Sequence, residues 1–310
     1  MFRAMDRSSV TLERMRSFVR VVERGSLSAV AREEGVGQST ISRHVAELEA
    51  ALGASLLNRT TRRLTLTDEG RRFHAEARTI LRLVDEATDG VRNAGGGLTG
   101  TVRVSCTAAL GVRHVCRALF ALQDRYPGIS IDLSLTDERI DLVREATDIA
   151  IRLGPLAESS LQRKAIGRSR RILVASRGYL ADHGRPQLPV DLSRHLAIRM
   201  SNVAGSDTLC LHGPDGATAR IPVGGNLLVD HGLAAREALA QGRGIAVAHV
   251  WLVDDLLAAD AIEQVLPDHA PEPVPLSILV VPGRIRIKRV RLVVDALAAA
   301  LSELPGLDRP

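Results

Sequence analysis

The feature that most constrains this chain is the spacing of three residues, Ala31, Gly35 and Ile41, within one largely polar segment. A small residue at position 31 lets one helix approach another closely, and Gly35 can take the positive φ of a tight turn after the first helix. Ile41 then points from a second helix into the core, followed on the same face by Val45 and Leu48. This is the steric pattern of a helix-turn-helix, although an αα-hairpin used only for packing has the same skeleton.

The outward face of the second helix carries residue types that hydrogen-bond base edges and phosphates in a major groove. These residues are Gln38, Ser39, Thr40, Ser42 and Arg43. After this helix, the alternation over 55–67 indicates a two-stranded hairpin with Thr60–Arg63 at its turn. Such a wing would place Arg59, Arg62 and Arg63 against DNA phosphates or in the minor groove. The alternative is a solvated basic turn.

A long helix is predicted from about residue 68 to 93. Thr67 can cap it, and Asp68 and Glu69 favour the positive end of its dipole. Its apolar positions recur at intervals of four and three, as in the seam of a coiled coil. They are Phe73, Ala77, Ile80, Val84, Ala87 and Val91. We expect this helix to pair with a second subunit, the alternative being that it packs on its own domain. Three glycines at 95–97 predict a hinge.

From residue 98 the pattern alternates between strands and helices, which favours mixed sheets covered by helices, with ligands near the carboxyl ends of the strands. Strands are predicted at 101–106, 129–135 and 148–153, and near 171–175, 196–200, 217–223, 244–249 and 276–282. Helices are predicted at 111–125, 137–145, 231–242, 250–257 and 286–303.

Composition narrows the class of protein. The 310 residues, 45% of them apolar, suffice for a sizeable core. No apolar run approaches the ~20 residues of a membrane span, and the start MFRAMDRSSV has no signal core, so we expect a cytoplasmic protein that does not bind membranes. Cys106, Cys116 and Cys210 lack metal-ligand spacing, and we expect no metal or cofactor. The few aromatic residues do not cluster with the arginines, which disfavours a stacking platform for single strands.

The chain resembles the LysR-type transcriptional regulators along nearly its whole length. The similarity is strongest from Leu12 to Arg71 and continues in FALQDRYPGISIDLSL at 120–135, DIAIRLGPL at 148–156 and QGRGIAVAH at 241–249. Gly37 is a departure, because the family often has Ser as the cap of the recognition helix. Glycine at this position costs only roughly a few tenths of a kcal/mol relative to serine, so the helix should form.

The resemblance implies three domains. A winged helix-turn-helix would span 1–67, a linker helix with its hinge 68–97, and a two-lobed α/β effector domain, similar to periplasmic binding proteins, 98–310. Lobe I would hold about 98–168 and 272–310, and lobe II about 169–271, with two crossover strands between them. The implied function is a bacterial, homodimeric or homotetrameric regulator that binds double-stranded DNA, responds to a small molecule and is not an enzyme.

The resemblance also places the effector between the lobes. The positions that match the family's cleft are Thr107, Thr136, Arg152, Asp230 and His231. Hydroxyls at strand ends and a guanidinium can hold a small anion, which favours an organic acid. Asp230 could instead pair with Arg152 in the empty state, or select an effector with a donor or a positive charge. A purely structural alternative is that Arg152 only tethers the lobes.

Two other functions, redox sensing and catalysis, have candidate residues in the sequence. Cys106 ends the first predicted strand of the effector domain, where a thiol could be oxidised in place of binding a ligand. This gives a redox-sensing regulator as the alternative. Catalysis would have to involve His114, Cys116, Asp207 or His249, whose spacing matches no nucleophile elbow, phosphate loop or metal site.

Overall fold

The computed structural model describes residues 10–59, 64–92, 98–138, 142, 147–156, 161–203 and 205–309. The chain forms two compact units that divide near residue 97. The hinge predicted at 95–97 lies outside the described residues, as does most of the helix predicted at 137–145.

The first unit is helical with one small hairpin. It consists of α1 (Leu12–Arg24), α2 (Leu27–Glu33), α3 (Gln38–Leu52), β1 (Leu57–Arg59), β2 (Leu64–Leu66) and α4 (Asp68–Arg92). Side-chain oxygens start the first two helices, because Thr11 accepts from the amide of Arg14 and Ser26 from that of Ala29. The apolar faces of the helices meet in one core, in which Phe18 is fully buried.

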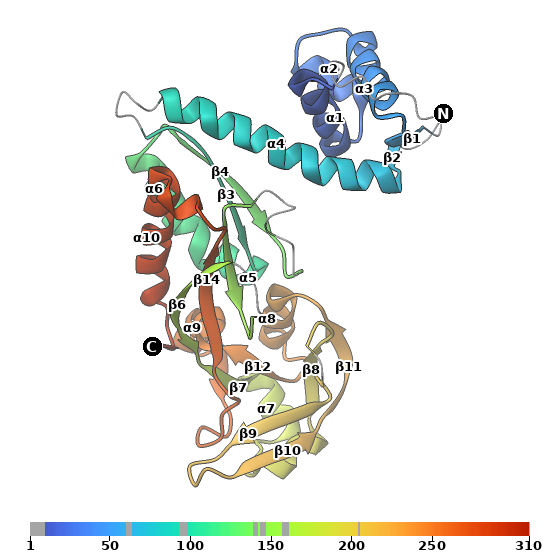
Figure 1. The fold of residues 1–310 in the computed structure, drawn as a ribbon. Helices are drawn as coiled ribbons and strands as arrows, with labels where there is room; N and C mark the ends of the chain where they lie inside the picture. Colours follow the sequence, from blue (N-terminus) through green and yellow to red (C-terminus); the bar gives the residue numbers. More distant parts are fainter. Residues whose placement is uncertain are drawn as a thin grey trace. The chain divides into compact units, whose positions relative to one another are not determined.

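The second unit contains a six-stranded sheet in the order β15-β6-β14-β5-β3-β4. Its strands are β3 (Gly100–Cys106), β4 (Ile129–Leu135), β5 (Ile149–Leu153), β6 (Gln162–Ser169), β14 (Val274–Val280) and β15 (Leu307–Asp308). β3 runs parallel to β4 and β5, whereas β14 runs antiparallel to β5 and β6. Helices α6 (Cys116–Arg125) and α10 (Lys288–Ser302) pack together beside this sheet (Figure 1). We call this sheet and its helices the first lobe.

The second lobe is built on a five-stranded sheet in the order β11-β8-β12-β7-β13. Its strands are β7 (Arg171–Ser176), β8 (Leu196–Met200), β11 (Gly224–Val229), β12 (Ile245–His249) and β13 (Ile262–Gln264). Residues on one face pack with α8 (Gly232–Ala240) and α9 (Val250–Ala258). Residues on the other face pack with α7 (Arg177–His183), a 3₁₀ turn (Pro189–Arg194) and the hairpin of β9 (Thr208–His212) and β10 (Thr218–Pro222).

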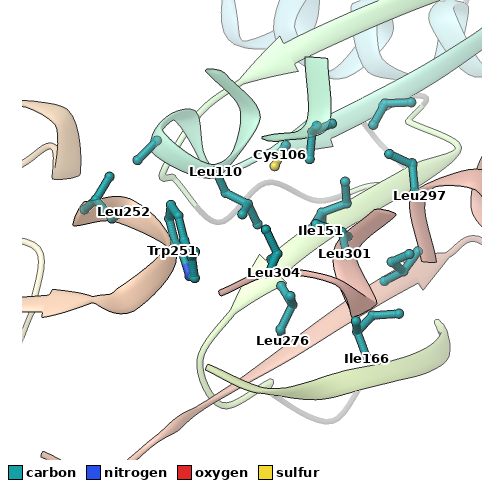
Figure 2. Packing of buried hydrophobic residues seen from close by; sticks show 14 of the residues in the cluster. Cys106, Leu110, Ile151, Ile166, Trp251, Leu252, Leu276, Leu297, Leu301 and Leu304 are labelled. Atoms are coloured by element: carbon teal, nitrogen blue, oxygen red, sulfur yellow. The ribbon is translucent and has the colours of Figure 1, made fainter. Parts of the chain in front are cut away.

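The apolar core runs continuously from the first lobe into the second. Trp251 of α9 is 1% exposed and is directed toward Leu110 and Leu304 of the first lobe, as Figure 2 shows. The helix predicted at 111–125 differs in detail: α5 (Ala108–Leu110) leads into a π-helical turn (Gly111–Val115) before α6 begins. A Cβ at Gly111 would lie 2.2 Å from the side chain of Leu135, so glycine allows this close approach.

A buried ion pair lies at the end of the first-lobe sheet where β5 begins. Arg284 Nε donates to Asp148 Oδ1 at 2.7 Å, and the backbone amide of Arg103 in β3 donates to Asp148 Oδ2 at 2.9 Å. The carboxylate is 1% exposed and the guanidinium 6% exposed. Arg284 lies in a 3₁₀ turn after β14, so one carboxylate joins the start of β5 to the middle of β3 and to the segment that follows β14.

Replacing Asp148 by alanine should therefore strongly destabilise the second unit. Removing one partner of a buried pair leaves an uncompensated charge and costs about 3–5 kcal/mol. Asp132, whose carboxylate is 63% exposed and lies 3.5 Å from Arg103, is the control, and its loss should cost under about 1 kcal/mol. Urea unfolding followed by the fluorescence of Trp251, the single tryptophan, measures both values. Equal costs for the two variants would contradict this role of Asp148.

Candidate DNA-binding and effector-binding sites

The turn between α2 and α3 has the predicted geometry. Gly35 adopts φ 67°, Ala31 is 4% exposed, and Ile41 is fully buried. The face of α3 that was predicted to be buried also carries Val45 and Leu48, and neither side chain has any exposed surface. The spacing that pointed to a helix-turn-helix is thus confirmed by the way the two helices pack.

The opposite face of α3 is polar and open. Gln38, Ser39 and Arg43 are exposed, and Thr40 and Ser42 are partly exposed. No ion pair involves Arg43 among the residues that the structure describes, so its guanidinium keeps its donors for another acceptor. Gly37 caps α3 without a side-chain hydrogen bond. The first amides of the helix therefore have no side-chain cap, an arrangement that suits a phosphate oxygen.

The predicted wing is an antiparallel hairpin in which Leu57 of β1 pairs with Leu66 of β2. Arg59 is the last residue of β1, while Thr60–Arg63, including Arg62 and Arg63, lie outside the described residues. Glu49 of α3 was missed in the sequence. Its Oε1 accepts hydrogen bonds from the amides of Leu56 and Leu57 at 2.7 and 3.0 Å, which attaches the hairpin to the helix beside it.

Helix α4 starts as predicted, with Thr67 Oγ1 accepting from the amide of Gly70 at 2.9 Å. The predicted seam needs correction at its beginning. Ala77 is fully buried in the core of its own unit, and the ring of Phe73 lies 5.8 Å from that of Phe18 in α1. Intramolecular packing thus uses this half of the stripe. Further along, Ile80 is 37% exposed, Val84 is partly exposed and Ala87 is exposed, while Val91 has no described side chain.

Two threonines follow adjacent parallel strands of the first lobe. Thr107 comes directly after β3, and its buried hydroxyl makes no hydrogen bond with an oxygen or nitrogen of the described residues. Thr136 comes directly after β4, and its hydroxyl accepts from the amide of Glu138 at 3.2 Å. The amide of Thr136 donates to the carbonyl of Cys106 at 2.9 Å, which keeps the two strand ends together.

Arg152 lies on β5 and is held by its own lobe. Its guanidinium donates to Ser105 Oγ at 2.7 Å and to the carbonyl of Ile151 at 3.0 Å. Burial lowers the pKa of Arg152, and the negative charge of Asp137 opposes that shift. The described residues show no ion pair between Arg152 and Asp230, so the empty-state pairing considered from the sequence is not present.

The acid of this region is Asp137, which the sequence analysis missed. Its Oδ1 accepts from the amide of Ala108 at the start of α5 at 3.1 Å. Its Oδ2 lies 3.9 Å from Nε2 of His231, which caps α8 of the second lobe through Nδ1. Asp230 is exposed, and its carbonyl accepts from Asn202 at 2.8 Å. Asp137 follows a strand end as Thr107 does, and that position was the available signal.

The environment of Cys106 does not favour a thiol sensor. The residue has no exposed surface, and burial raises the pKa of its thiol to about 12. The thiolate, which is the species that oxidants attack, is therefore scarce at neutral pH. Cys116 is partly buried and Cys210 is exposed, and both are free thiols.

The histidines considered for catalysis make structural contacts. His114 Nε2 lies 3.0 Å from the carbonyl of Trp251, and His249 Nδ1 lies 2.8 Å from Ser169 Oγ. Burial lowers the pKa of His249 to about 3, so this ring is neutral at physiological pH. The described residues contain no cluster of three metal-ligating side chains. They also include no helix with the length and apolar character needed to cross a bilayer.

Two family models match this chain. Residues 12–71 match the bacterial regulatory helix-turn-helix protein of the LysR family, and residues 95–302 match the LysR substrate binding domain. The HTH-type transcriptional activator AaeR of Escherichia coli strain K12 is 30% identical over 297 residues, which cover 96% of each chain.

Solved full-length structures are also similar. The virulence activator AphB of Vibrio cholerae is 28% identical with a TM-score of 0.64, covering 94% of this chain and 99% of that one. CrgA of Neisseria meningitidis is 28% identical with a TM-score of 0.61, covering 93% and 98%. The chain therefore belongs to the LysR family and is a DNA-binding transcriptional regulator whose second unit is a small-molecule-responsive domain.

Proposed function

We propose that α3 enters the major groove and that the wing contacts the flanking backbone. The exposed polar face of α3, on which Arg43 makes no ion pair with a described residue, carries this proposal. The residues of α3 that contact the major groove, at base edges or at phosphates, are Gln38, Ser39, Thr40, Ser42 and Arg43. The residues of the wing that bind phosphates are Arg59, Arg62 and Arg63. Because its DNA lies in the bacterial cytoplasm, we place the protein there, and we assign it no catalytic step.

The dimer in this proposal forms through the exposed half of α4. Ile80 and Leu83 are 37% and 53% exposed, so a short stretch of this helix presents neighbouring apolar side chains to solvent. Exposed apolar patches often mark protein–protein contacts. A single helix-turn-helix touches few bases, so pairing two copies gives the specificity that one lacks. Dimers, and tetramers assembled from them, are the expected states.

The effector proposal is a small organic acid bound where the two lobes of the second unit meet. The buried hydroxyl of Thr107, the strand-end Thr136 and the guanidinium of Arg152 provide donors from the first lobe. His231 and Asp230 stand at the start of α8 in the second lobe. Asp137 interacts with groups from both lobes. Burial lowers the pKa of Arg152, the charge of Asp137 opposes that shift, and Oδ2 of Asp137 lies 3.9 Å from Nε2 of His231. An incoming carboxylate would compete with Asp137 for Arg152 and for the imidazole of His231.

Two arginine substitutions should separate base reading from backbone contact. Arg43→Ala should reduce discrimination between sites by about 1–3 kcal/mol, whereas Arg62→Ala should weaken all sequences and lower the salt slope by about one. Salt-dependent binding to a duplex library measures both effects. Arg291→Ala, an exposed arginine of α10, is the control. Failure of the folded protein to bind any duplex at low salt would refute the assignment.

Charge placed on the exposed half of α4 should disrupt the dimer. Ile80→Glu buries a carboxylate at a subunit contact, so we expect monomers, or loss of tetramers, and weaker operator binding. Ile80→Val keeps the apolar surface and should behave as wild type. Sedimentation and operator affinity are the measurements, and an unchanged mass for Ile80→Glu would place the interface elsewhere.

Once an effector has been identified by thermal shift, two variants test its site. Thr107→Val and Arg152→Ala should each weaken effector binding by about tenfold, because each removes a donor to the anion. The DNA affinity of the ligand-free protein should stay near normal. Calorimetry that finds undiminished effector binding in both variants would exclude this location.

A further inference from the structure

The second lobe contains a cavity of about 330 Å³ within its own fold. Its walls come from β8, the β9–β10 hairpin, β12 and α8. None of the five residues proposed for the effector site lines it. The volume is within the range of small-molecule pockets, about 300–1,000 Å³.

The cavity arises from the way two neighbouring strands separate. β8 and β12 pair at one register position only, Ile245 with Ala197, whereas β12 pairs with β7 along its whole length. Ile198–Met200 and Val247–His249 therefore stand apart without hydrogen bonds between them, and all six residues line the cavity. On α8, the small side chain of Ala235 adds room at this opening.

The residues that line the cavity suit an anion with an apolar body. Apolar residues such as Leu209, Val223 and Leu252 contribute most of the lining, which also includes the basic residues Arg171 and Arg199. The lining residues include no aspartate or glutamate. Arg171 is partnered by a neutral group, since its Nε and Nη2 donate to the carbonyl of Glu272 at 3.0 and 2.7 Å.

Arg199 has a donor that its own fold does not use. Its Nη2 donates to the carbonyl of Gly225 at 3.0 Å, but its buried Nε has no hydrogen-bond partner among the described residues. Buried donors in native proteins are almost always satisfied, so the guanidinium of Arg199, a residue of the cavity wall, is not fully compensated by its own fold. A carboxylate supplies charge and acceptor lone pairs at once.

We propose that this cavity binds a small monocarboxylate with an apolar body, its carboxylate at Arg199 and its body between the separated strands and the β9–β10 hairpin. This site is additional to the one proposed between the lobes. The two are joined by α8, because His231 at its start faces Asp137 and Ala235, one turn later, lines the cavity. Any coupling that α8 carries between the two sites is reciprocal.

Trp251 reports occupancy of this cavity. It is the single tryptophan of the chain, and its ring stacks on that of His249, a wall residue, with centroids 5.3 Å apart. Titration of the full-length protein with benzoate, and in parallel with hexanoate, should give a saturable change in tryptophan fluorescence. Benzamide, which has the shape of benzoate without its charge, should bind about tenfold more weakly or worse.

Three variants locate the bound acid. Arg199→Met keeps the length of the side chain and removes its charge, and Ala235→Leu fills the space while leaving both cations in place. Each should weaken benzoate binding about tenfold or more, whereas Arg220→Met on the exposed side of β10 should not. The unfolding midpoint of each variant verifies that it is folded, and Ala235→Leu tests the proposal if Arg199→Met does not fold.

Two results would overturn the proposal. One is the absence of saturable binding of either acid to the wild-type protein. The other is loss of binding in Thr107→Val with full binding in Arg199→Met and Ala235→Leu, which would place the acid between the lobes. This second result would support the effector site proposed there, so failure of the cavity and failure of that site are distinguishable.

Discussion

The second unit depends on one buried carboxylate. The carboxylate of Asp148 accepts from Arg284 and from the amide of Arg103, and its burial makes any misalignment of the three strands costly. The strands that it aligns end, at their other extremity, in the positions of the proposed effector site. Thr107 follows β3, and Arg152 lies one residue from the end of β5. The alignment of the strands at one end of the sheet thus fixes the spacing of the polar groups at the other end.

Local patterns made much of this fold predictable. The strand at 129–135 was predicted to the residue and another was predicted near 196–200, because apolar residues alternate or cluster there between clear breaks. The helix-turn-helix was accessible for the same reason: Ala31, Gly35 and Ile41 are each required by contacts within a few residues of chain. The start of α4 followed from Thr67, whose capping bond spans three residues.

The parts that the sequence did not predict depend on distant contacts. β6 carries Gln162, Arg163 and Lys164 at one end, and it forms a strand because β14 pairs with it along seven register positions and β15 along two. The stripe on α4 was ambiguous because periodicity shows that a face is buried without showing what buries it, and α1 takes Phe73 and Ala77. Asp137 becomes significant only when α8 brings His231 near it, 94 positions along the chain.

The strands that cross between the two lobes of the second unit limit how the lobes can move relative to each other. A single residue, Arg170, separates β6 from β7, and β14 lies beside β6 with their hydrogen bonds intact up to Ser169 and Val274. A paired ribbon resists sliding, because displacement along the strands would break every bond of the register, yet it bends easily across its flat face. Two strands thus cross between the lobes side by side, so a rotation of one lobe against the other would bend this ribbon and leave its register intact.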